Sequence, residues 1–344
     1  MLRLTELKLP LDHPADALRP AICERLGIAD KELLDFSIFK RSYDARKKSA
    51  ITLIYTLDIT VADEAALVGK FADDRHVGPT PDTRYKFVAE APADLKSRPV
   101  VIGTGPCGLL AGLILAQMGF KPIILERGKA VRERTKDTWG LWRKNKLNPE
   151  SNVQFGEGGA GTFSDGKLYS QIKDPQHHGR KVLEEFVKAG APEEILYVSK
   201  PHIGTFRLVK MVESIRATIA GLGGEIRFGS KVERLVIEDH QVRGVVLADG
   251  ETIATDHVVL AVGHSARPTF EMLHARAALD RGRGPRGLGQ PFPESGIEWH
   301  GALLQEEAQG ALRPIGAQPL PDRPRRVEAD PAGCREHALS GCGD

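Results

Sequence analysis

The chain has 344 residues, enough for two domains, and 41% of them are apolar, which is ordinary for a globular protein. A net charge of +2 excludes a strong overall field toward nucleic acid or an anionic membrane. The cysteines Cys23, Cys107, Cys334 and Cys342 form no CxxC pair and no zinc-like spacing with histidines. We therefore expect no metal site and no disulfide framework. The N-terminal residues lack the apolar run of a secretion signal, which favours a cytoplasmic protein.

Residues 1–90 predict a small α+β domain. Apolar and polar residues alternate as in half-buried strands at 2–11, 33–40, 50–61 and 83–89, and helices are predicted at 16–26 and 63–73. The resulting order βαββαβ predicts a ferredoxin-like sandwich. A basic run, KRSYDARKK at 40–48, has two interpretations: a solvated turn between two strands, or a surface that grips RNA.

A linker at residues 91–98 leads into the most informative segment. Residues 99–102 predict a strand, 109–118 a helix and 122–125 a second strand that ends at Glu126. Residues 100–120 carry no charge and are long enough to cross a bilayer. Their glycines and proline would interrupt the first half of such a helix, so we favour a buried strand, turn and helix and expect no membrane span.

The turn GTGPCG places Gly103, Gly105 and Gly108 at GxGxxG spacing, with Pro106 between them. This spacing after a strand and before a helix is typical of dinucleotide sites. Gly103 allows the tight turn, Gly105 lets the backbone approach a pyrophosphate, and Gly108 lets the helix pack on the strand. The alternative is a purely structural turn.

Two residues after the second strand complete this predicted site. Glu126 is placed to accept hydrogen bonds from a ribose diol, which favours FAD or NAD over NADP; its alternative is a solvated strand end. Arg127 is predicted to lie on the adenine or to neutralise phosphate, and a surface arginine is the alternative.

Further along, a glycine-rich loop at 152–168 contains Gly158, Gly159, Ala160 and Gly161, which favours a backbone that touches a ligand or forms an anion nest; the alternative is a flexible surface loop. Helices are predicted at 129–147, 178–190 and 203–222, and strands at 224–228, 232–238, 242–248 and 256–262. Val232 is predicted to meet adenine through its backbone, and Gly263 to return the last strand to the cofactor.

Two other residue groups are discounted as sites. Cys107 lies at a helix N-terminus that would stabilise a thiolate, but a phosphate is expected there, so we interpret it as a packing residue. His177 and His178 lie in a polar loop without cysteine partners, so a metal site is not expected there.

The segments FKRSYDARKKSA, APADLKSRPVVIGTGPCGL, NVQFGEGGAGTFSDGKLYSQIKDP, LYVSKPHIGTFRLVK and VVLAVGHSAR resemble a bacterial family of FAD-dependent oxidoreductases, also labelled NAD-utilising dehydrogenases. The resemblance runs from residue 1 to about 276. It implies a glutathione-reductase-like FAD domain at 99–276, incomplete in this chain, after a ferredoxin-like domain. It also implies that Gly103, Gly105, Gly108 and Glu126 hold the pyrophosphate and ribose of FAD, that residues 158–161 form a second FAD-contacting loop, and that Gly263 lies near the cofactor.

The resemblance stops abruptly. Arg267-Pro268 lacks the acidic residue expected there, and residues 277–344 are rich in Arg, Pro and Gly with one predicted helix at 305–312. The interpretations are a disordered tail or a translation that left its frame, so that the C-terminal half of the family's fold is missing.

The sequence therefore predicts an FAD-dependent oxidoreductase of unknown substrate and oligomeric state, inactive if the missing half carries the flavin ring site. No second GxGxxG lies between a predicted strand and a predicted helix, so NAD(P)H is expected to bind transiently or not at all. The alternatives are a flavoprotein that acts on RNA through its basic N-terminal segment and a non-catalytic FAD-binding relic.

Overall fold

The computed structural model describes residues 1–47, 49–168 and 172–280. Its N-terminal part contains β1 (Leu2–Pro10), η1 (Ala15–Ala17), α1 (Leu18–Leu26), η2 (Asp30–Glu32), β2 (Leu33–Asp44), β3 (Thr52–Val61), α2 (Glu64–Lys70) and β4 (Val77–Pro79). The four strands pair antiparallel in the order β2-β3-β1-β4. Alternate positions of β3 are buried against α1 and α2, so one face of the sheet forms the core. The predicted order βαββαβ is confirmed.

The predicted positions of the fourth strand and of the basic turn in this part are wrong. The fourth strand is Val77–Pro79, which pairs with Leu2–Leu4, whereas residues 83–89 form no strand because no sheet edge lies beside them. The predicted turn at 41–48 begins too early. Arg41–Asp44 pair with Tyr55–Thr52 and belong to β2, so the cross-strand ladder continues through a run that is polar in sequence.

The second part is built on a parallel sheet. Its elements are β5 (Val100–Ile102), α3 (Pro106–Gln117), β6 (Ile123–Glu126), α4 (Val131–Lys144), η3 (Ala160–Phe163), α5 (His178–Lys188), η4 (Glu193–Leu196), α6 (Thr205–Gly221), β7 (Glu225–Phe228), β8 (Val232–Glu238), β9 (Gln241–Leu247), β10 (Thr252–Ala254), β11 (Val258–Leu260) and α7 (Arg267–Asp280). The parallel sheet has the order β11-β5-β6-β7, and β10-β9-β8 form an antiparallel ribbon. The chain is therefore mixed α/β, as predicted; β10 and α7 were not predicted.

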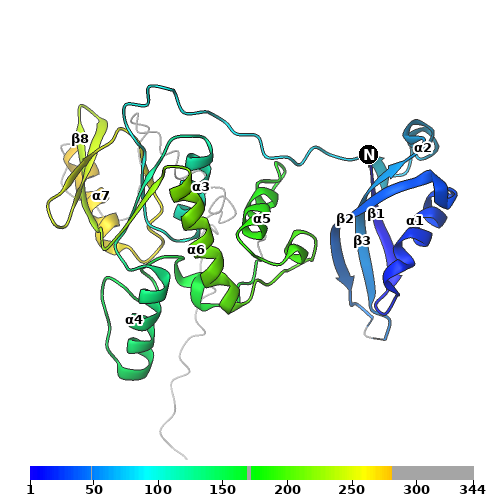
Figure 1. Ribbon diagram of the computed structural model, residues 1–344, viewed down its shortest axis with the longest axis horizontal. Coiled ribbons are helices and arrows are strands. Elements are labelled where there is room, and N and C mark those ends of the chain that lie inside the picture. Colours follow the sequence, from blue (N-terminus) through cyan, green and yellow to red (C-terminus); the bar gives the residue numbers. More distant parts are fainter. Residues whose placement is uncertain (48, 169–171, 281–344) are drawn as a thin grey trace, which may run out of the picture.

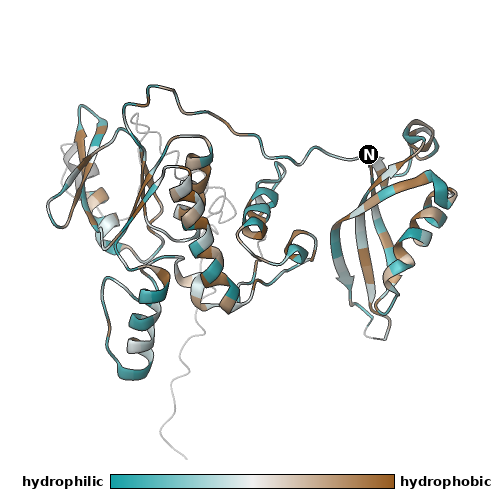
Figure 2. Cartoon of the chain, viewed as in Figure 1, coloured by the Kyte–Doolittle hydropathy of each residue, from teal (hydrophilic) through white to brown (hydrophobic). Residues whose placement is uncertain are grey.

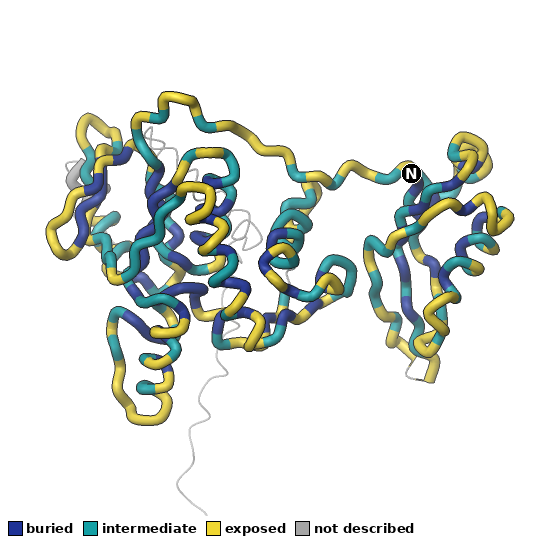
Figure 3. Tube along the Cα trace, viewed as in Figure 1, coloured by how far each residue is buried: buried dark blue, intermediate teal, exposed yellow. Residues whose placement is uncertain are grey.

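Helices cover one face of the parallel sheet and the ribbon covers the other (Figure 1). Val101 and Ile124 pack toward α3 and α6, whereas Val100, Ile102 and Leu125 pack toward the ribbon. This alternation follows from the two-residue period of a strand. Apolar residues concentrate in these strands (Figure 2), and so do the buried positions (Figure 3). Because both faces of the parallel sheet are covered, its strands are continuous apolar runs in the sequence.

The uncharged run at 100–120 forms β5, the glycine turn and α3, so the membrane interpretation of this run is wrong. Within the described part of the chain, no helix combines the length and apolar character needed to cross a bilayer.

A connection without helix or strand, residues 80–99, joins the two parts, and the predicted boundaries at 90 and 98 fall inside it. The parts also touch. The backbone of Arg41 on β2 donates to the carbonyl oxygen of Tyr197 (2.6 Å) and accepts from the N–H of Ser199 (2.8 Å). Phe39 lies edge-on to His177 beside this bridge. The outer edge of β2 is thus partly paired by the segment after η4.

Candidate functional site

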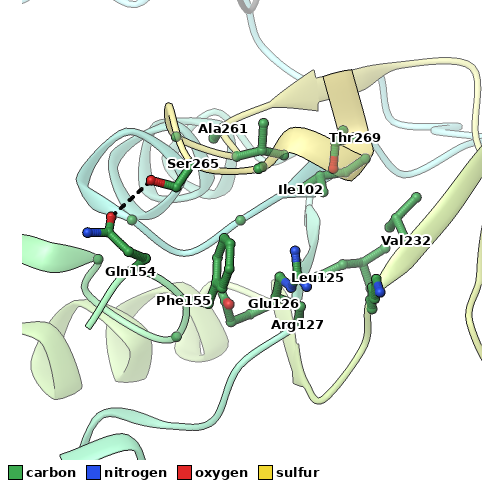
Figure 4. A pocket seen from close by; sticks show the side chains of 18 of the residues that line it. Ile102, Leu125, Glu126, Arg127, Gln154, Phe155, Val232, Ala261, Ser265 and Thr269 are labelled. Carbon is green, nitrogen blue, oxygen red and sulfur yellow. Dashed lines mark hydrogen bonds between the residues drawn. The ribbon is translucent and has the colours of Figure 1, made fainter. Parts of the chain in front are cut away.

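A cavity of about 350 Å³ opens at the carboxyl ends of β5, β6 and β11 (Figure 4). This is the edge at which α/β sheets bind ligands, and the volume lies near the lower end of the ~300–1,000 Å³ of small-molecule sites. The predicted site residues that line it are Gly103, Gly105, Pro106, Glu126, Arg127, Gly159, Ala160, Val232 and Gly263. The fold thus brings together segments that lie more than a hundred residues apart in sequence.

The glycine turn leaves no room for side chains at two of its positions. A Cβ on Gly103 would lie 2.4 Å from the carbonyl oxygen of Ala261, and one on Gly108 would lie 1.9 Å from that of Gly103. Gly103 also has a φ of +105°, which favours glycine. Gly108 lies beneath the turn rather than at the cavity wall, as its predicted packing role requires.

Gly105 is different, because a Cβ there would meet no atom within 4 Å. It caps the N-terminus of α3 with extended backbone and lines the cavity. Protein packing therefore does not explain the absence of a side chain at this position. The open space fits a group that approaches the helix N-terminus closely, such as a phosphate.

Glu126 is buried at the end of β6 and already accepts three hydrogen bonds. Its Oε2 accepts from the backbone N–H and hydroxyl of Thr104 (2.8 and 2.7 Å), and its Oε1 accepts from the N–H of Gly128 (2.8 Å). A carboxylate offers about four acceptor positions, so Oε1 retains one. Glu126 therefore joins the turn to β6 and still has capacity for a hydroxyl in the cavity.

Arg127 is held by its neighbours at the cavity wall. Its Nε donates to Glu150 (2.6 Å), whose other oxygen accepts from Lys231 (3.2 Å), and its guanidinium lies 4.0 Å from the centre of the Phe155 ring. The paired acid lowers the net charge of this corner. These residues present an arginine plane and an aromatic ring to the cavity, both suited to stacking on a flat base.

The glycine-rich loop approaches the turn from the opposite side. The N–H of Gly158 donates to the carbonyl oxygen of Thr104 (2.8 Å). A Cβ on Gly159 would lie 3.0 Å from Cδ of Pro106, and one on Gly158 would lie 2.2 Å from the Thr162 hydroxyl. Gly159 and Ala160 thus face the cavity, whereas Gly158 packs against η3, and Gly161 has open space around it away from the lining.

Two buried charges near this loop were not found from the sequence. The Arg134 guanidinium on α4 is fully buried and bonds four backbone carbonyl oxygens. Glu157 is also fully buried; its Oε2 accepts from the N–H of Val131 (2.8 Å) and from Arg216 (2.7 Å). Burial raises the pKa of Glu157, and the Val131 and Arg216 bonds oppose that shift. In the sequence, both residues lie in polar segments, where charged side chains are ordinarily exposed to solvent, so no pattern marks them as buried.

Gln154 and Ser265 were missed as well. The Ser265 hydroxyl donates to Oε1 of Gln154 (3.3 Å), which links the glycine-rich loop to the β11–α7 turn across the cavity (Figure 4). Neither residue carries a sequence signal, because both lie in loops that only the fold brings together.

The discounted residues lie elsewhere. Cys107, in the first turn of α3, packs against the core, and burial raises the pKa of its thiol, so no thiolate is favoured there. His177 lies against Phe39 and His178 against Tyr85, and the described residues include no cluster of metal-ligating groups.

Comparison with known proteins gives partial matches along the sequence. A family model described as a domain of unknown function (DUF8436) matches residues 1–60. An uncharacterized protein of Clostridium beijerinckii is 41% identical over 273 residues, covering 79% of this chain and 50% of that protein. Thiamine thiazole synthase of Pyrococcus furiosus is 23% identical over 211 residues, covering 58% of this chain and 66% of that protein. The chain thus spans about half to two thirds of the length of these relatives.

Solved structures show weaker likeness. THI4 of Thermovibrio ammonificans is 21% identical with a TM-score of 0.35, covering 53% of this chain and 63% of its own. The 3-ketosteroid-Δ4-(5α)-dehydrogenase of Rhodococcus jostii RHA1 is 17% identical with a TM-score of 0.31, covering 64% and 56%. These values are too low for a ligand or reaction to be carried over to this chain.

Proposed function

We propose that this chain binds FAD at the cavity on the carboxyl edge of its parallel sheet and belongs to an FAD-dependent oxidoreductase. The observation that carries the proposal is the convergence of the GTGPCG turn, Glu126 and the Gly159–Ala160 segment on that cavity. Turn and helix N-terminus suit a pyrophosphate, and an acid at the end of the second strand suits an unphosphorylated ribose.

Each part of the adenosine diphosphate half has a matching group. The open space beside Gly105 would admit the pyrophosphate, and the remaining acceptor position of Glu126 would bind a ribose hydroxyl. Arg127 and Phe155, which stack on each other, would lie together against one side of the base. Val232 borders the same end of the cavity, and Gly263 borders the end near the loop after β11. A bound flavin would supply hydride and electron transfer. The chain's own residues would bind and orient it.

The RNA-binding alternative is less well supported. It depended on a basic turn, and β2 takes in residues 40–44 of that run. Arg41 lies with its guanidinium 5.4 Å from the ring centre of Tyr197, so this cation faces the protein rather than solvent.

The experiment is a visible absorption spectrum of the purified 344-residue chain, followed by identification of the released cofactor. Bound FAD, or binding of added FAD, is the expected result. Gly105→Val should weaken FAD binding about ten- to hundred-fold, because its methyl groups would occupy the space left for the phosphate. Gly78→Val is the matched control, since a Cβ there also meets no atom within 4 Å but lies in β4.

Two outcomes would count against the proposal. A folded wild-type chain that neither contains nor binds FAD would refute it. Equal FAD affinity of Gly105→Val and wild type would place the cofactor elsewhere. If wild type binds FAD, reduction of the bound flavin by an added electron donor tests the oxidoreductase activity.

A further inference from the structure

We infer that Arg134 is a positioning residue that fixes the Gly159–Ala160 peptide with its N–H directed into the cavity, as a hydrogen-bond donor for phosphate. The inference rests on the proposed dinucleotide site and adds a residue that does not itself line the cavity.

Arg134 is a buried cation whose guanidinium donates hydrogen bonds to backbone carbonyl oxygens. Its Nε donates to the carbonyl oxygen of Asn152 (2.8 Å) and its Nη2 to that of Val153 (2.6 Å). Its Nη1 donates to the carbonyl oxygens of Glu157 (2.7 Å) and Gly159 (2.8 Å). No carboxylate is hydrogen-bonded to it, although a buried guanidinium is costly without compensation. Burial lowers the pKa of Arg134 to about 10, so it stays charged at neutral pH.

The hydrogen bonds from Arg134 to backbone carbonyl groups also determine where the N–H groups of the following residues point. In a trans peptide, the C=O of one residue and the N–H of the next point opposite ways. The Glu157 carbonyl points to Arg134, and the next N–H, of Gly158, points away and meets the Thr104 carbonyl oxygen at 2.8 Å. The turn and Arg134 therefore lie on opposite sides of this loop.

The same rule applies to the Gly159–Ala160 peptide, two residues further along the loop. The Gly159 carbonyl points to Arg134, so the Ala160 N–H points away from it, toward the side of the turn. Gly159 lies against Gly105 and Pro106, and Ala160 lines the cavity. No acceptor for the Ala160 N–H exists among the described residues. An unpaired backbone donor at a ligand cavity calls for a ligand acceptor.

The loop is shaped around the arginine. Gly156 has a φ of +121°, and a Cβ there would lie 2.3 Å from Cδ of Arg134. The Arg134 guanidinium also lies 4.8 Å from the centre of the Phe163 ring, at the end of η3. Arg134 thus contacts the loop before and after the Gly159–Ala160 peptide, which restricts how that peptide can rotate.

Arg134→Lys in the full chain tests this role, because one ammonium cannot reach four carbonyl oxygens in the geometry of a planar fork. Binding of FAD, ADP and adenosine is measured by calorimetry. We expect ten- to hundred-fold weaker FAD and ADP binding, about the loss of one hydrogen bond to a charged group, and unchanged adenosine binding. Arg132→Lys, an exposed position on the same helix paired with Glu213, is the matched control.

A second readout does not depend on flavin. The Ala160 amide signal in NMR spectra of the ¹⁵N-alanine-labelled chain should shift when inorganic pyrophosphate is added to wild type, and should not shift in Arg134→Lys. Gly159→Ala perturbs the same peptide from the other side, since its φ is +63° and its Cβ would meet Pro106 at 3.0 Å. It should show the same selective loss of ADP binding, and it decides the question if Arg134→Lys fails to fold.

The outcomes separate the two proposals. Wild type that binds FAD, with Arg134→Lys equal to it or with ADP and adenosine weakened alike, would overturn the role of Arg134 and leave the function standing. Wild type that ignores FAD but shows the pyrophosphate shift, lost in Arg134→Lys, would overturn the function and support the role of Arg134. An Ala160 amide that never responds to pyrophosphate would overturn the role directly.

Discussion

Removal of Arg216 should make the stability of the second part of the chain strongly pH-dependent. Arg216 donates to Oε2 of Glu157, which is fully buried, and the opposite carboxylate oxygen, Oε1, has no partner in the described residues. Arg216→Met keeps an apolar stem near Phe228, whose ring centre lies 5.6 Å from the guanidinium, but leaves the buried carboxylate with the Val131 N–H and without a cationic partner.

The magnitude follows from proton linkage. Burial already raises the pKa of Glu157 above its usual 4.5, so at pH values between the unfolded and the folded pKa the folded state binds more protons than the unfolded chain. The free energy of unfolding therefore falls as pH rises from 4.5 through the folded pKa. Loss of Arg216 raises that pKa further. Because the buried carboxylate can take up a proton, the loss in free energy of unfolding is at most about 1.4 kcal/mol for each pH unit above 4.5. This limit is about 3.4 kcal/mol at pH 7 and about 0.7 kcal/mol at pH 5.

Urea unfolding at pH 5 and pH 7 measures this difference, with tryptophan fluorescence as the signal because Trp139 and Trp142 lie on α4 beside the loop. The double variant Glu157→Gln/Arg216→Met should lose most of the extra pH dependence. Arg132→Met, which breaks an exposed pair with Glu213, is the control and should change little at either pH. Equal destabilisation of Arg216→Met at both pH values would refute the reasoning.

Three further predictions concern other contacts. Gly108→Ala should destabilise the chain and abolish FAD binding, because its methyl group would lie 1.9 Å from a carbonyl oxygen, whereas Gly161→Ala, with no atom within 4 Å, should do neither; thermal melts and cofactor release compare them. Cys107 should react with iodoacetamide more slowly at pH 7.5 than a free thiol does, since burial raises its pKa; fast labelling of the peptide that contains Cys107, identified by mass spectrometry, would contradict this. Ser199→Pro removes the donor to the Arg41 carbonyl oxygen and should speed proteolysis of the connection at residues 80–99; unchanged cleavage would show that the bridge does not hold the two parts together.

Local patterns determined much of the second part. The strand, turn and helix around Gly103–Gly108 could be predicted from local sequence, because Gly108 must approach the carbonyl oxygen of Gly103, and Glu126 ends the next apolar run, β6. The run of apolar residues predicted buried strands because each strand buries both faces. Nine of the twelve residues predicted for the cofactor line one cavity. Those near Gly103, Glu126 and Gly263 follow strands whose carboxyl ends meet at one edge, whereas Gly159 and Ala160 reach it through the glycine-rich loop.

Only the tertiary structure decided the rest. The fourth strand of the first sheet is three residues long and exists because β1 offers an edge to pair with, so residues 83–89 have the alternation but not the partner. Arg134, Glu157 and Arg216 are charged residues in polar stretches of sequence, and such residues are ordinarily solvated. The burial of Arg134 and Glu157, the ion pair of Glu157 with the partly exposed Arg216, and the direction of the Ala160 N–H depend on α4, α6 and the glycine-rich loop packing together, which no local pattern encodes.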